Sequence, residues 1–138
     1  MIKKISDYLM KIGVEHATDI KRMALSFNVN SPDGTWPCSI LVNRNEQSSK
    51  VVGVYSTLPV KVPVDLLNHM ALFLMCLNND RLYGNFELDP DTGELHFKTY
   101  LDFENRAFSE KAVEQNMICN VSVMQKYTNR FMRIINCA

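Results

Sequence analysis

Apolar residues recur along the first part of the chain at two spacings, one typical of helices and one typical of strands. Over residues 2–12 they recur at three- and four-residue steps, which predicts an amphipathic helix that ends at Gly13. Over residues 21–30 and 36–42 they alternate with polar residues, which predicts two half-buried strands. The turn-forming sequence Ser-Pro-Asp-Gly at 31–34 joins these strands into a hairpin.

The middle of the chain predicts a third strand and a second helix. After a polar loop over 43–50, a valine-rich strand runs over 51–58 and stops at Pro59 and Pro63. In the helix expected over 64–78, the apolar positions exceed the single stripe that one neighbour would cover. We therefore expect this helix to be covered on more than one side.

The last part of the chain predicts a second hairpin and a long helix. Two-residue alternation over 83–103 flanks an Asp-Pro-Asp-Thr-Gly turn at 89–93. Ser109 suits the N-cap of a final helix that extends to Asn136 and is apolar along one side. The predicted order is α-β-β-β-α-β-β-α, an α+β fold in which a five-stranded antiparallel sheet is combined with three helices.

Length and charge narrow the class of protein. The chain has 138 residues, so we expect a single domain over 1–138. Fifteen basic residues balance fifteen acidic ones, which disfavours binding to nucleic acid or to an anionic membrane. The longest apolar run, residues 70–77, is far shorter than a membrane span of about twenty residues. Because the N-terminus lacks the apolar segment of a signal peptide, we expect a cytoplasmic protein with reduced cysteines.

Candidate chemical groups do not form a known catalytic or metal-binding motif. His69 and Cys76 lie about 10.5 Å apart along one helix, too far to bind one metal ion, and we expect Cys76 and Cys119 to be buried. The acidic turn at 89–93 lacks the glycine and carboxylate positions of a calcium loop; a solvated strand face explains it, with an acidic docking surface as the alternative. The three histidines lack a sequence-adjacent nucleophile, although tertiary contacts could assemble a triad. We therefore predict a non-enzymatic protein without a cofactor or a metal.

A group of asparagine, glycine and aromatic residues follows the second predicted helix. Asn78 and Asn79 suit a left-handed end of that helix, because asparagine tolerates this conformation. Gly84 suits a bulge or a close backbone approach at the start of a strand, with Tyr83 and Phe86 as packing residues. We expect structural roles for all five residues.

This part of the chain resembles the bacterial YbjN family. The resemblance rests on LPVKVP at 58–63, LNND at 77–80, YGNFELD at 83–89, GEL at 93–95 and KTYL at 98–101. It implies an α+β, often dimeric, chaperone-like protein without a known enzymatic reaction, similar in element order to type III secretion chaperones. The name sensory transduction regulator, sometimes attached to the family, implies a regulatory role.

The excess apolar surface of the helix over 64–78 leads to a prediction of function. One face of this helix covers the sheet, which leaves Leu66, Met70, Phe73 or Leu77 for the long final helix or for a second subunit. Because a two-fold dimer is the commonest way to cover such a patch, we expect a homodimeric module that binds a protein partner. The alternative is a small-molecule sensor or an uncharacterised enzyme, with a pocket between the sheet and the C-terminal helix.

Overall fold

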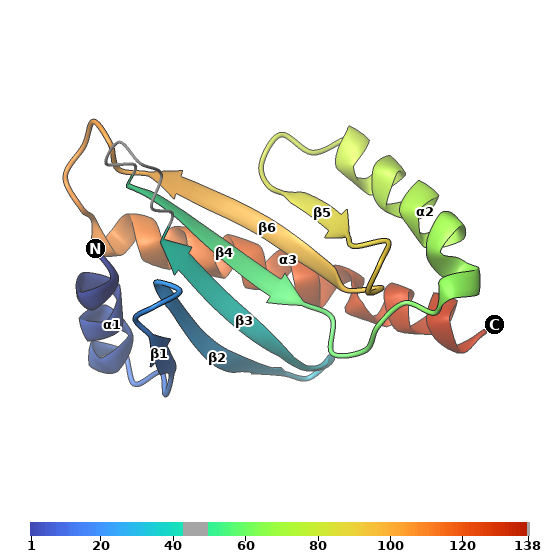
Figure 1. Ribbon diagram of the computed structural model, residues 1–138, viewed down its shortest axis with the longest axis horizontal. Coiled ribbons are helices and arrows are strands. Elements are labelled where there is room, and N and C mark those ends of the chain that lie inside the picture. The colour runs from blue at the N-terminus through green and yellow to red at the C-terminus, as the bar shows by residue number, and fades with distance from the viewer. Residues whose placement is uncertain (43–49, 138) are drawn as a thin grey trace.

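The computed structural model describes residues 1–42 and 50–137, so all but the last residue of the polar loop predicted over 43–50 lies outside the described residues. The described part of the chain forms the α-helices α1 (Ile2–Lys11), α2 (Leu67–Asn79) and α3 (Glu110–Asn136), with a short 3₁₀ helix η1 (Val64–Leu66) directly before α2. Its strands are β1 (Ala17–Asp19), β2 (Ala24–Ser31), β3 (Gly34–Val42), β4 (Val51–Thr57), β5 (Asn85–Leu88) and β6 (Leu95–Asp102). The strands form one antiparallel sheet in the order β1-β2-β3-β4-β6-β5 (Figure 1).

The α+β fold class is as predicted, but the sheet has six strands rather than five. The additional strand is β1, which pairs with β2 through Ala17 opposite Ser26 and Asp19 opposite Ala24. All three residues of β1 are exposed, so the strand has no apolar alternation from which it could be recognised. A second difference is that β2 begins at Ala24, because residues 20–23 form the turn between β1 and β2.

The helices cover one face of the sheet and leave the other face open. In Figure 1, α3 runs behind the length of the sheet, α1 lies near β1 and β2, and α2 lies at the opposite end beside β5. One apolar cluster joins α1 to the central strands and the N-terminal half of α3, and a second joins α2, β5 and β6 to the C-terminal half of α3. Among residues 1–42 and 50–137, no helix covers the other side of the sheet, which we call the open face.

Alternation along the central strands assigns their side chains to these two faces. Trp36, Cys38, Ile40 and Val42 of β3 are buried on the helical side, as the sequence predicts. Because successive side chains of a strand alternate between the two faces, Pro37, Ser39 and Leu41 of β3 point to the open side. Residues of β4 that lie opposite them in register point to the same side.

Polar side chains fix α3 to the sheet. Ser109 accepts a hydrogen bond from the backbone amide of Ala112 at 3.1 Å, which is the predicted N-cap contact. Near the middle of the helix, the buried amide nitrogen of Asn120 donates to the carbonyl oxygens of Val54 at 2.8 Å and Phe97 at 3.0 Å. These two bonds join α3 directly to β4 and β6.

Candidate interaction site

The outward side of α2 is apolar and exposed. Ala71, Leu72, Met75 and Cys76 lie on this side of the helix and are all exposed; we call these four residues the outer stripe. Leu72 is 58% exposed and Met75 is 61% exposed. From Leu67 to Asn79 the helix contains no Asp, Glu, Lys or Arg, so the outer stripe has no charged neighbour on its own helix. Such an apolar side, left open in the single chain, is typical of a contact surface.

The opposite side of α2, together with the end of η1 before it, faces the core and contains the four residues predicted as partner contacts. Met70 is 0% exposed within the single chain, so the structure does not leave it for a second subunit. Leu66, Phe73 and Leu77 are half-buried against the apolar cluster shared with α3, and the ring of Phe73 packs edge-to-face on Phe131 at 6.0 Å. The sequence left these residues either for the final helix or for a second subunit. In the structure they pack in the cluster shared with the final helix, α3.

Apolar residues occur on almost every side of α2, so their positions in the sequence do not distinguish its buried side from its exposed side. Such a pattern shows that more than one side is apolar, but it does not show which side faces the sheet. For this reason the sequence does not identify Leu72 and Met75 as the exposed residues. The structure places them, rather than Met70, on the surface.

The cysteines differ from the sequence prediction in the same region. Cys76 is exposed as part of the outer stripe, and Cys119 is half-buried, so the prediction that Cys76 is buried was wrong. Cys38 is the buried cysteine of the described residues. Burial raises the pKa of its thiol to about 12, so Cys38 remains a neutral packing residue at physiological pH.

Residues of the predicted structural motif connect α2 to the sheet. The side-chain amide of Asn78 donates to the carbonyl oxygen of Phe86 at 2.9 Å and accepts from its backbone amide at 2.8 Å. Asn78 and Asn79 do not adopt the predicted left-handed conformation. Among the described residues, Met23 is the one non-glycine residue with a positive φ. The end of α2 is instead held by the paired bonds between Asn78 and β5.

The neighbouring Tyr83 and Gly84 lie against β6 and α3. The hydroxyl oxygen of Tyr83 accepts a hydrogen bond from the side-chain amide of Asn116 on α3. Gly84 has a φ of +73°, and a Cβ atom at this position would lie 2.9 Å from the carbonyl oxygen of Lys98. The glycine is thus required by a close approach of two backbone segments, and Phe86 is buried in the core beside Phe97.

The acidic turn is organised by its own backbone. The carboxylate of Asp89 accepts hydrogen bonds from the backbone amides of Asp91 at 2.8 Å and Thr92 at 3.3 Å. These backbone bonds lower the pKa of Asp89 below its usual value of 3.8. These contacts give Asp89 a structural role, because its carboxylate stabilises the turn.

A polar network lies on the open face where β5 meets β6. Glu87 receives hydrogen bonds from His96 at 2.9 Å and from Lys98 at 3.1 Å. Burial raises the pKa of Glu87, but these hydrogen bonds outweigh burial and hold the pKa below its usual value of 4.5. Because the folded pKa is lowered, the network stabilises the fold above pH 4.5, and this stabilisation is lost as the pH falls through the folded pKa.

This network predicts the acid response of a Glu87→Gln variant. Without the carboxylate, the variant should be slightly less stable than the wild type at pH 7 and should lose less of its remaining stability as the pH falls below 4.5. Urea unfolding followed by circular dichroism at pH 7, 5 and 3.5 measures the difference. The exposed carboxylate of Glu15 provides the control, because Glu15→Gln should follow the wild type. Identical pH profiles for Glu87→Gln and the wild type would show that the network adds no stability.

One histidine does meet a hydroxyl through tertiary contact. The Nδ1–H of His16 donates to the backbone carbonyl oxygen of Val14 at 2.9 Å, and Nε2 forms a hydrogen bond with the hydroxyl of Ser6 at 2.7 Å. In a catalytic triad a carboxylate occupies the place that a carbonyl oxygen takes here. The pair joins α1 to the segment before β1, and we interpret it as a structural contact.

Two classes of site are not found among residues 1–42 and 50–137. No group of three or more His, Cys, Asp and Glu residues in this part is placed to hold a metal ion. None of the helices in this part is long and apolar enough to cross a membrane.

A hollow of about 560 Å³ lies on the open face of the sheet. Leu41, Gly53 and Tyr100 lie opposite one another in register across β3, β4 and β6 and form its centre. The alternative function required a pocket on the other face, between the sheet and the C-terminal helix. That interface is filled by side chains such as Val54 and Met124, both 0% exposed.

Comparison with solved structures shows the same fold in proteins of low sequence identity. YbjN from E. coli, named as a candidate transcription regulator, is 15% identical with a TM-score of 0.68, over 96% of this chain and 93% of that chain. In the ExsC–ExsE complex the matching chain is 11% identical with a TM-score of 0.64, over 93% of this chain and 90% of that chain. In the HopA1–SchA chaperone–effector complex the match is 12% identical with a TM-score of 0.62, over 93% of this chain and 94% of that chain.

No protein-family model and no curated protein sequence matches the chain. The chain therefore has a YbjN-like fold, which it shares with a chain of the ExsC–ExsE complex and a chain of the HopA1–SchA chaperone–effector complex.

Proposed function

We propose that this chain, a single YbjN-like domain over residues 1–138, is a non-enzymatic, chaperone-like module that acts as a homodimer and binds a protein partner. The observation that carries the proposal is the outer stripe of α2. Leu72 and Met75 expose most of their side chains to solvent on a helix that has no charged residue. In a monomer this apolar side would stay in contact with water, which is unfavourable in free energy.

A two-fold dimer through the outer stripes would cover this surface. In such a dimer each stripe contacts its own copy, so an apolar side meets an apolar side. Ala71 and Cys76 are small enough to let two helices approach, while Leu72 and Met75 provide the larger side chains that pack between them. Asn68 and Asn79 at the two ends of the stripe are exposed and would form a polar rim.

The structural neighbours support a protein as the partner. ExsC is seen with ExsE, and SchA is seen with HopA1 as a chaperone with its effector. By analogy we propose that the present dimer binds a protein in the bacterial cytoplasm, with a regulatory consequence, and that it binds neither nucleic acid nor membrane. The balance of fifteen basic and fifteen acidic residues agrees with this partner class.

The thiol of Cys76 reports directly on whether the outer stripe is covered. In the dimer we expect iodoacetamide to modify Cys76 much more slowly than Cys137, although both thiols are exposed in the single chain. Mass spectrometry of the intact and digested protein gives the two rates. Unfolding in urea should make the two rates similar, which controls for differences in intrinsic reactivity. Equal rates in the native protein would mean that nothing covers the stripe and would contradict the proposed interface.

A further inference from the structure

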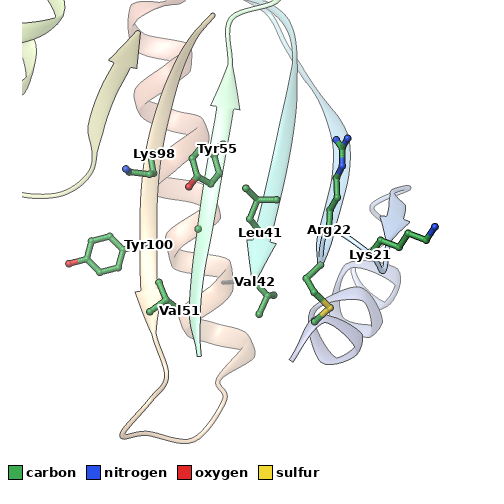
Figure 2. Close-up of a pocket in the computed structure, with 10 residues that line it drawn as sticks. Lys21, Arg22, Leu41, Val42, Val51, Tyr55, Lys98 and Tyr100 are labelled. Atoms are coloured by element: carbon green, nitrogen blue, oxygen red, sulfur yellow. The ribbon is translucent and has the colours of Figure 1, made fainter. Parts of the chain in front are cut away.

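The hollow on the open face is lined in part by Gly53. This glycine lies in the interior of β4, between Leu41 of β3 and Tyr100 of β6. Its two neighbours in register carry large side chains, and the ring of Tyr55 lies over the glycine. The gap in this surface therefore lies between Leu41, Tyr55 and Tyr100 (Figure 2). The volume of about 560 Å³ falls within the range of small-molecule sites.

The walls of the hollow are apolar and aromatic. The ring of Tyr55 leans along β4 towards the gap, and its edge lies 2.8 Å from the position that a Cβ atom of Gly53 would take. An edge-to-face contact with His96, at 5.2 Å between ring centroids, supports Tyr55 from the other side. Val51 lines the opposite end of the gap. The hollow is thus shaped in advance by side chains that have their own packing contacts.

Cations lie along the margin of the hollow. Lys21, Arg22 and Lys98 are among its described lining residues, and none of these lining residues is a carboxylate (Figure 2). Two of the cations have carboxylate neighbours outside the lining, since Lys98 lies 3.0 Å from Glu87 and Arg22 lies 3.8 Å from Asp19. Arg22 and its partner are both well exposed, so that pair is weak and the guanidinium remains accessible to a ligand.

The turn that presents two of these cations has an unusual backbone. Met23, directly after Arg22 and itself part of the lining, has a φ of +52°. This conformation costs about 1–2 kcal/mol per residue for a side chain other than glycine. Strained positions of this kind are enriched at binding sites. Here the strained residue sets the direction of the turn beside the hollow.

We infer that the hollow over Gly53 binds a small amphipathic carboxylate. Its aliphatic or aromatic part would occupy the gap between Leu41, Tyr55 and Tyr100, where an apolar group loses contact with water. Its carboxylate would lie at the margin, within reach of Lys21 or Arg22. This site lies on the open face of the sheet, whereas the proposed dimer contact lies on α2, so the two can be tested separately.

Decanoate is a suitable probe, with decylammonium as its counterpart of opposite charge. We expect decanoate to give saturable amide chemical-shift changes in ¹H–¹⁵N spectra below about 1 mM, confined to the hollow and centred on Gly53. Gly53→Val places its Cβ atom 2.8 Å from the ring of Tyr55, so the ring must shift and the shape of the gap changes. This variant should fold, because β-branched residues suit strand interiors, and should bind decanoate at least tenfold more weakly. Decylammonium should cause no such changes.

Two further variants separate shape from charge. Lys21→Gln combined with Arg22→Gln removes two exposed cations without altering the gap and should also weaken decanoate binding severalfold. Asn28→Val adds a similar side chain at an exposed position of β2 outside the lining and should leave binding unchanged. Absence of saturable shifts at the hollow would overturn the inference. So would equal decanoate binding by folded Gly53→Val, or equal binding of decylammonium by the wild type.

Discussion

Replacing Met75 by glutamate is expected to convert the protein from a homodimer into a monomer. Met75 is 61% exposed in the single chain and lies in the outer stripe of α2. In the proposed dimer, Met75→Glu would bury an unpaired carboxylate in each of two copies, at a cost of about 3 kcal/mol or more. This cost corresponds to a dimer at least about 100-fold weaker. Light scattering coupled to size-exclusion chromatography measures the change in mass.

A matched substitution on another helix provides the control. Ile118 on α3 is 59% exposed, so Ile118→Glu places the same charge at a similarly exposed apolar position outside the stripe. We expect this variant to keep the mass of the wild type. Circular dichroism should show the same helix content in both variants, because both positions face solvent in the single chain. If Met75→Glu kept the wild-type mass, or if both variants dissociated alike, α2 would not be the specific contact.

Replacing Asn120 by alanine is expected to give the largest loss of stability among the substitutions considered. The side chain is 0% exposed, and the two hydrogens of its amide nitrogen donate to the carbonyl oxygens of Val54 and Phe97. Removal leaves buried acceptors without this donor and opens a small cavity, which together cost about 3 kcal/mol. For a chain of this length the loss corresponds to a melting temperature lower by about 10 °C.

Urea and thermal unfolding at one fixed protein concentration measure the effect, because the proposed dimerisation would make stability depend on concentration. Asn120→Asp should be at least as damaging, since it directs carboxylate oxygens at backbone carbonyl oxygens that need a donor. Asn129→Ala on the exposed side of α3 is the control, with a change within about 0.5 kcal/mol. If Asn120→Ala were as mild as Asn129→Ala, the buried amide would not hold α3 to the sheet.

The sequence predicts the fold well wherever one side of an element is buried. The alternation in β3 and the N-cap at Ser109 were both correct, because burial and capping leave a local signal in the sequence. The three-residue strand β1 left no such signal, because all of its side chains are exposed. Its pairing with β2 became visible only from the structure.

The candidate sites were less predictable, for physical reasons that differ from site to site. For α2, a helix apolar almost all round does not show which side remains exposed, and the structure exposes Met75 rather than the predicted Met70. For the hollow, the sequence does contain a signal: Gly53 interrupts a valine-rich strand, where glycine marks a gap or a close approach. Asn120 likewise lies on the apolar side of α3, where a buried amide requires a partner.

The mass of the wild-type protein in solution tests the central claim, a homodimer built on the apolar outer side of α2, most directly. Multi-angle light scattering across a wide range of protein concentrations should give twice the 15.9 kDa of one chain, falling towards the single-chain value only on strong dilution. The mass of one chain at every concentration would show that the outer stripe stays exposed to water, and it would contradict association through α2.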